Sequence, residues 1–265
     1  MTNNEIQKNY QQPERPRNAA AVHQLVVICI DTSGSMKDTA EDGRMKYKIV
    51  EEMINGLANM QLDDYDKDNT DICILVFDDD VRTLVDWRPL SEFEGGISLD
   101  VAGCTSLGSA VITAIDKTRE RRKEYYAQGI DSKRAQIFVY TDGYSTESLE
   151  TAHKRVSQYL DRPSPVAKMY MILMPPAKDP SELMGFGQSV TILRANNCVN
   201  GLPESFKFMQ ASIVAASQSA VGDKTTVTIP DIPDICVANR DGKDGTTKDS
   251  NGNIVIEDDN DHFSW

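Results

Sequence analysis

Residues 26–35 read VVICIDTSGS: five apolar residues, an aspartate, and a hydroxyl-rich turn that contains a glycine. An unbroken apolar run of this kind predicts a β-strand that is buried on both faces. After the strand, Asp31, Ser33 and Ser35 alternate along the chain, so their oxygen atoms can point at one centre. Mg²⁺ prefers such oxygen ligands. A plainer interpretation is that Asp31 and Ser33 only cap a following helix, and this stretch alone leaves both interpretations open.

The alternation of apolar strands with helical segments continues outward from this stretch over residues 21–221. Apolar runs predict further strands at 72–77, 82–87, 137–140, 168–174 and 190–193, and apolar residues at helical spacing predict helices at 49–60, 107–115, 147–160 and 206–216. This order predicts a doubly wound α/β fold, with a mostly parallel central sheet and helices on both faces. Ligands of such folds bind at the carboxyl ends of the strands.

The two ends of the chain differ in composition from this middle part. Residues 1–20 are polar, carry no apolar segment typical of a signal peptide, and predict a flexible N-terminal arm. Residues 222–265 hold ten acidic and four basic side chains, so a net charge of −6 lies there out of −13 in total. They predict an acidic C-terminal extension with a hairpin at Asn251-Gly252 and a flexible tail.

The overall composition excludes some classes of partner. The chain has 28 Lys and Arg against 41 Asp and Glu, and its pI is near 4.7. This balance argues against binding to nucleic acid or to an anionic membrane surface. No apolar run approaches the roughly 20 residues of a membrane-spanning helix. The five cysteines form no C-x-x-C pair and are expected to be reduced, which together with the polar N-terminus predicts a cytoplasmic protein.

Two further loops at the same predicted sheet edge carry oxygen ligands. The loop at 102–108 (AGCTSLG) holds Thr105 just before a helix, and Thr141-Asp142-Gly143 follows the strand at 137–140. Because the carboxyl ends of parallel strands meet at one edge, these oxygens are expected to converge with those of the first loop. We therefore expect one Mg²⁺ or Mn²⁺ ion, held by Asp31, Ser33, Ser35, Thr105 and Asp142.

In their order along the chain, these three loops resemble a von Willebrand factor A (vWA) domain with an intact metal-ion-dependent adhesion site (MIDAS), over roughly residues 21–221. The resemblance implies that Ser33, Ser35 and Thr105 contact the ion directly. It implies that Asp31 and Asp142 act through waters or hydrogen bonds. It also implies one open coordination position, which an Asp or Glu of a partner protein fills.

Four segments (76–78, 87–90, 103–108 and 206–213) are similar to the bacterial TerY-like subgroup of this family. That similarity implies a role in a tellurium-resistance, stress-response or defence system, with a protein kinase or phosphatase encoded nearby as a candidate partner. The sequence departs from some relatives at its end, where an acidic segment replaces a cysteine-rich zinc-binding module.

The sequence carries no P-loop, no G-x-S-x-G elbow and no H-E-x-x-H motif. Its three histidines, His23, His153 and His262, are interpreted as solvated. We therefore expect a binding module and no enzymatic activity. The alternative function is a Mg²⁺-dependent hydrolase acting on phosphate substrates, and a third is a structural scaffold with an empty site.

The remaining acidic clusters are predicted to be solvated. Residues 64–68 and 249–253 depart from the EF-hand pattern, and residues 78–80 are interpreted as an exposed turn. Residues 257–261 raise a sharper hypothesis, in which the tail supplies a carboxylate to the metal and masks the site until a partner displaces it. The plainer interpretation is a solvated tail or a docking strip for a basic partner.

Overall fold

A computed structural model describes residues 21–142, 144–177, 179–187, 189–220, 224–229, 234–237, 247–250 and 253–259. The predicted N-terminal arm, residues 1–20, lies outside the described residues, as does Gly143. None of the described helices combines the length and the hydropathy that crossing a membrane requires.

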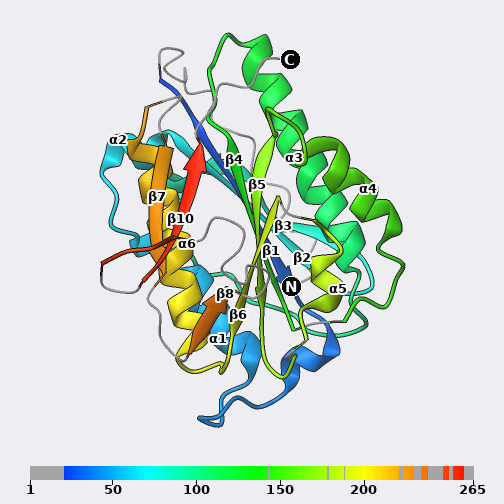
Figure 1. Ribbon diagram of the computed structural model, residues 1–265. Helices are drawn as coiled ribbons and strands as arrows, with labels where there is room; N and C mark the ends of the chain where they lie inside the picture. Colours follow the sequence, from blue (N-terminus) through cyan, green and yellow to red (C-terminus); the bar gives the residue numbers. More distant parts are fainter. Residues whose placement is uncertain are drawn as a thin grey trace, which may run out of the picture.

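A seven-stranded sheet forms the centre of the fold (Figure 1). Its strands, in spatial order, are β3 (Val81–Pro89), β2 (Thr70–Phe77), β1 (Gln24–Asp31), β4 (Ala135–Thr141), β5 (Ala167–Leu173), β6 (Val190–Ala195) and β8 (Ile235–Val237). The five central strands, β2, β1, β4, β5 and β6, run parallel to one another. The two edge strands, β3 and β8, are antiparallel to their neighbours. The predicted fold class, a mostly parallel and doubly wound α/β sheet, is confirmed.

Helices cover both faces of the sheet (Figure 1). They are α1 (Lys46–Asn55), α2 (Asp64–Asp68), α3 (Leu107–Ala127), α4 (Glu150–Tyr159), α5 (Ser181–Met184) and α6 (Gly201–Gln218), with single 3-10 turns η2 (Gly34–Lys37), η3 (Gly56–Asn59) and η4 (Leu90–Glu92). Residues 64–68, one of the acidic clusters predicted to be solvated, form the short helix α2. Asp63 caps this helix by accepting a hydrogen bond from the Asp66 backbone N–H (2.8 Å).

The apolar run in β1 is buried because alternate side chains enter two separate cores. Val26, Ile28 and Ile30 pack in the core that contains residues of α1 and α6. Leu25, Val27 and Cys29 pack in the core that contains residues of α3 and α4. Every residue of β1 is therefore buried, and the strand ends with Asp31 at the carboxyl edge of the sheet.

The described residues beyond 222 contribute strands to this architecture. β8 extends the main sheet at β6. A second sheet, in the order β7 (Lys224–Ile229), β10 (Ile254–Asp259) and β9 (Thr247–Lys248), lies beside α6 (Figure 1). Val227 and Ile256 from this sheet join the same core as α1 and α6.

β9 and β10 pair in antiparallel fashion, as the predicted hairpin requires, and its turn residues 251 and 252 lie outside the described residues. The prediction of a flexible tail is wrong for Glu257, Asp258 and Asp259. These residues continue β10 and pair with Thr226, Thr225 and Lys224 of β7. The strand continues over these residues because the side chain of the preceding Ile256 packs in the core and is only 1% exposed. Residues 260–265 lie outside the described residues.

Candidate metal centre

Asp31 is the fully buried first residue of the site. One carboxylate oxygen accepts a hydrogen bond from the backbone N–H of Ser33 (2.9 Å), and the other accepts one from the hydroxyl of Thr141 at the end of β4 (2.9 Å). Burial raises the pKa of Asp31 to about 6, and the charge of Asp142 adds to the rise, whereas the hydrogen bonds oppose it. Asp31 is thus a buried carboxylate that two neighbouring loops hold in place.

The two serines link Asp31 to the loop after β4. The Ser33 hydroxyl lies 3.1 Å from the Ser35 hydroxyl, which in turn donates a hydrogen bond to Oδ1 of Asp142 (2.9 Å). Ser33 is buried, whereas Ser35 is exposed at the first turn of η2. Hydrogen bonds therefore connect the side-chain oxygens of four predicted ligands into one chain of oxygens, in which the Ser33 backbone N–H provides the link to Asp31. Ser35 lies on the side of this chain that faces solvent.

Thr105 lies on a loop that packs against this chain of oxygens. The backbone N–H of Gly34 donates to the carbonyl of Gly103 (3.0 Å), and that of Ala102 donates to the carbonyl of Thr32 (2.9 Å). Thr105 itself is 6% exposed, and its carbonyl accepts a hydrogen bond from the Thr146 backbone N–H (3.0 Å). Among the described residues of the site, Thr105 is the one predicted ligand whose side chain is not hydrogen-bonded to the other four.

The loop after β2 holds the Thr105 loop in position, which the sequence did not indicate. Gly103 has a φ of +74°, and a Cβ atom there would lie 2.5 Å from a carboxylate oxygen of Asp79. That carboxylate accepts a hydrogen bond from the Cys104 backbone N–H (2.8 Å). Gly103 therefore supplies both an unusual backbone conformation and the space for Asp79.

Asp78, predicted to be exposed in a turn, is in fact 6% exposed. Its carboxylate accepts hydrogen bonds from the Thr32 hydroxyl (3.2 Å) and from the guanidinium of Arg82. The prediction failed because Thr32, between two site residues, turns inward to a partner that sequence spacing does not reveal. Asp78 supports the first loop, and Asp79 and Asp80 remain exposed as predicted.

Lys46 is a site residue that the sequence analysis missed. Its ammonium donates to Oδ2 of Asp142 (2.7 Å) and to the carbonyl of Pro175 (3.2 Å), and the side chain is almost fully buried. A signal exists in the sequence, since Lys46 lies three and four residues before Ile49 and Val50 and therefore on the apolar stripe of α1. A lysine on a core-facing stripe needs a buried partner.

The donor set fits a small hard cation. Neighbouring ligands of an octahedral Mg²⁺ at about 2.1 Å are separated by about 3.0 Å, close to the 3.1 Å and 2.9 Å that separate the successive side-chain oxygens of Ser33, Ser35 and Asp142. Two carboxylates and three hydroxyls are oxygen ligands only. Within the described residues, no group of three or more His, Cys, Asp or Glu side chains that could hold a metal is found, so any ion here depends on the hydroxyls.

Neither of the two histidines that the structure describes contributes to this site. His23, predicted to be solvated, is 2% exposed and packs against the ring of Tyr125, because it lies between β1 and the turn at Ser132. His153 is half-buried, with its ring edge-on to Phe186. His262 lies outside the described residues. Cys29 and Cys73 are free and buried, as predicted.

Comparison with known proteins supports one family for the central part of the chain. Residues 26–145, a little under half of the chain, match the model of the von Willebrand factor type A domain, which supports a vWA domain over these residues. Comparison with the curated proteins found no match.

Among solved structures, the VWA domain of SpRpn10 is 13% identical, with 69% of this chain aligned to 95% of that chain and a TM-score of 0.51. This likeness concerns the fold. Proximal thread matrix protein 1 (PTMP1) from the mussel byssus is 13% identical over 78% of this chain, with a TM-score of 0.49, and this chain spans about half of its length (49%). The protein BatB from Bacteroides thetaiotaomicron is 18% identical over 74% of this chain and 99% of that chain, with a TM-score of 0.48.

Proposed function

We propose that this protein is a Mg²⁺-dependent protein–protein interaction module, which binds a carboxylate of its partner at a MIDAS. The observation that carries the proposal is the connected chain of oxygens at the carboxyl edge of the sheet. It runs from Thr141 and Asp31 through Ser33 and Ser35 to Asp142. The vWA domain at residues 26–145 supports a role in protein interaction.

In this proposal, Ser33, Ser35 and Thr105 bind the ion directly, while Asp31 and Asp142 hold it through waters or hydrogen bonds. The bound ion supplies a positive charge and an open coordination position. The exposed hydroxyl of Ser35 places that position on the solvent side of the site.

Lys46 explains why the additional ligand would be an anion. The buried groups of the site, the carboxylates of Asp31 and Asp142 and the ammonium of Lys46, have a summed formal charge of −1; the carboxylate of Asp38, 3.5 Å from Lys46, is 63% exposed and is screened by solvent. A divalent cation would change this to +1, so the filled site would still attract negative charge. An Asp or Glu side chain of a partner protein supplies that charge together with an oxygen ligand.

The arrangement of the described groups supports binding without catalysis. The hydroxyl of Ser35 donates to Asp142, and the amine of Lys46 donates to Asp142 and to a backbone carbonyl. Nucleophilic catalysis needs a hydroxyl that faces a free base, whereas Asp142, the base that Ser35 faces, is held in an ion pair by Lys46. We therefore do not extend the proposal to a hydrolase of phosphate substrates.

We further propose that the partner belongs to a bacterial tellurium-resistance, stress-response or defence system, as the similarity to the TerY-like subgroup suggests. A kinase or phosphatase encoded nearby is the candidate. The five cysteines, which form no C-x-x-C pair, fit a cytoplasmic location. The net charge of −13 supports a protein partner and disfavours nucleic acid or a membrane surface.

Titration calorimetry tests the metal site. Mg²⁺ and Mn²⁺ should release or absorb heat with the native sequence and not with Asp31→Ala. Asp80→Ala, which removes an exposed carboxylate from a nearby loop, is the matched control and should bind as the native sequence does. Equal binding by Asp31→Ala would remove this site from the proposal. A pull-down from the source cells, with and without chelator, then tests whether the partner depends on the metal.

A further inference from the structure

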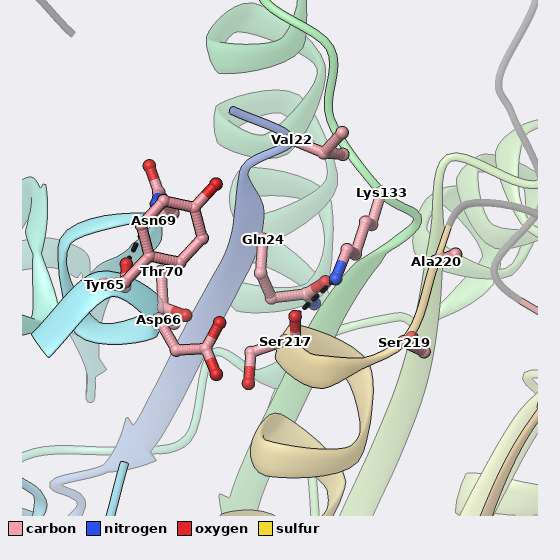
Figure 2. A pocket seen from close by; sticks show the side chains of 10 residues that line it. All are labelled: Val22, Gln24, Tyr65, Asp66, Asn69, Thr70, Lys133, Ser217, Ser219 and Ala220. Atoms are coloured by element: carbon pink, nitrogen blue, oxygen red, sulfur yellow. Dashed lines mark hydrogen bonds between the residues drawn. The ribbon is translucent and has the colours of Figure 1, made fainter. Parts of the chain in front are cut away.

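A cavity of about 400 Å³ lies at the opposite end of β1 from Asp31. It opens between α2, the first residues of β1 and β2, and the C-terminal end of α6 (Figure 2). The residues that line it are Val22, Gln24, Tyr65, Asp66, Asn69, Thr70, Lys133, Ser217, Ser219 and Ala220. Its volume is at the lower end of the range of about 300–1,000 Å³ that is usual for small-molecule sites.

Two buried oxygen atoms in the lining have no hydrogen-bond partner. They are Oε1 of Gln24 and Oγ1 of Thr70, on side chains that are 1% and 0% exposed. A buried polar group without a partner destabilises the fold by roughly 1–3 kcal/mol. Both atoms can accept a hydrogen bond. A ligand that donates hydrogen bonds would satisfy both atoms.

The charges around the cavity determine which kind of donor fits. The Lys133 ammonium already donates to the carbonyls of Ala216 and Ser217 at the end of α6, at 2.6 Å each. The amide of Asn69 likewise donates to the carbonyl of Tyr65 (2.9 Å). Backbone carbonyl oxygens of the protein thus already occupy these two donors, although the ammonium of Lys133 keeps its positive charge.

Asp66 adds a carboxylate to the lining. It enters from α2, opposite Ser217 at the end of α6 (Figure 2). Burial raises the pKa of Asp66, and the nearby Asp63 raises it further, whereas Lys133 lowers it. A cation placed beside Asp66 would favour the charged carboxylate, since opposite charges at short range stabilise each other.

We propose that this cavity binds a compact organic cation, a guanidinium or ammonium group on a short alkyl chain. Gln24 and Thr70 accept its hydrogen bonds, and Asp66 compensates its charge. Such a group is found on a free alkylamine and on an Arg or Lys side chain of a partner protein. The cavity is independent of the metal centre, because the two sites lie at opposite ends of β1.

Nuclear magnetic resonance of the full-length, metal-free protein tests the proposal with three probes. Agmatine represents a free cation, the peptide Gly-Arg-Gly represents a side chain, and propylurea is a neutral analogue of similar shape. We expect saturable amide shifts at residues 22–24, 65–70 and 217–220 with agmatine or with the peptide, and at least about tenfold weaker binding of propylurea. Tighter binding of agmatine favours a free amine, and tighter binding of the peptide favours a partner's side chain.

Two variants and one control complete the test. Asp66→Asn should weaken binding by about tenfold, and Thr70→Val, which keeps the side-chain shape, should weaken it several-fold. Asp64→Asn removes the same charge from an exposed position of α2 and should have no effect. The amide spectrum of each variant shows whether it is folded. Absence of saturable shifts with both cations, or equal affinity in the native sequence and Asp66→Asn, would overturn the proposal.

Discussion

The ammonium of Lys46 and the carboxylate of Asp142 form an ion pair of 2.7 Å in which both side chains are almost fully buried. The pair connects the first residue of α1 with the loop after β4. Removing one member of a buried pair leaves the other without compensation, which is strongly destabilising. Lys46 thus fixes the orientation of Asp142, and it also reduces the negative charge available to a metal ion.

Replacing Lys46 by Met should therefore have two opposite effects. The free energy of unfolding should fall by about 3 kcal/mol without metal, because Asp142 loses its buried partner. The affinity for Mg²⁺ should rise by about tenfold, or about 1.4 kcal/mol, because the site regains one negative charge. Denaturant unfolding and calorimetry measure these quantities.

The control for this variant is Lys48→Met, which removes the same charge from a more exposed position of α1, where Lys48 pairs with Glu51. It should change neither quantity appreciably. A folded Lys46→Met protein with unchanged or weaker Mg²⁺ binding would show that Lys46 does not limit the charge of the site.

Gly103→Ala should disturb the metal centre more than an ordinary glycine substitution does. The added Cβ would meet the Asp79 carboxylate at 2.5 Å, and the residue would keep a φ of +74°. Gly129→Ala is the matched control, with a φ of +68° and open space around the new atom. Both variants should lose about 1 kcal/mol through the backbone conformation. Only Gly103→Ala should also lose Mg²⁺ affinity in calorimetry, and equal affinity of the two would contradict the role of the loop.

The cysteines should differ sharply in reactivity. Burial raises the pKa of the Cys73 thiol to about 12, and burial together with the neighbouring Cys73 raises the pKa of Cys29 as well. Because the thiolate is the reactive form, neither should react with iodoacetamide at pH 8 in the folded protein. Cys104, exposed beside Thr105, should react readily.

Peptide mapping by mass spectrometry identifies the modified residue in each case. If a partner covers the metal centre, labelling of Cys104 should slow when partner and Mg²⁺ are both present and recover with chelator. Unchanged labelling in the complex would place the partner on another surface.

Deleting residues 254–265 should destabilise the protein. The deletion removes β10 and with it Ile256, and it uncovers Val227. The loss of this apolar contact should lower the free energy of unfolding by at least about 2 kcal/mol. Deleting only 260–265 leaves β10 intact and is the control.

The two deletions also test the hypothesis that an acidic tail masks the metal. If the masking carboxylate lies within 257–259, the longer deletion alone should tighten partner binding in a chelator-sensitive manner. If it lies beyond 259, both should do so. Equal partner affinity in all three proteins would remove the hypothesis.

Phosphate ester hydrolysis should be absent. The purified protein with Mg²⁺ or Mn²⁺ should not cleave p-nitrophenyl phosphate or nucleotides, since Ser35 and Lys46 both donate to Asp142 and provide no free base. Turnover that persists through purification and disappears in Asp142→Ala would instead support the hydrolase.

Hydropathy and residue spacing along the chain were sufficient to predict the central strands of the sheet. They also predicted that Asp31, Ser33, Ser35 and Asp142, four of the five proposed ligands, lie close together at its edge. Asp31, Ser33 and Ser35 are separated by short, fixed intervals, and Asp142 follows an apolar strand that could only be buried. The central apolar runs of β1 and β4 required a cover of helices on both sides. Spacing and hydropathy therefore contained the necessary information for these elements.

Burial that arises from distant contacts was not predictable in this way. Asp78 is polar and follows a strand, as an exposed turn residue would, and only the inward-facing Thr32 makes it a buried acceptor. β8 is a strand of three residues, too short for a periodic signal, and exists because β6 offers it an open edge. Lys46 required the assembled loop after β4 to be recognised as part of the site.

The bond between Thr141 and Asp31 joins residues 110 positions apart in sequence, on strands that are adjacent in the sheet. β2, β3 and α3 all lie between them in the chain. During synthesis, the cation site cannot exist until residue 142 has emerged and β4 has docked against β1. If the proposed function is right, the ability to bind the ion, and through it a partner, is therefore acquired late and in one step, and a truncated or mispaired chain would not bind its partner at this site.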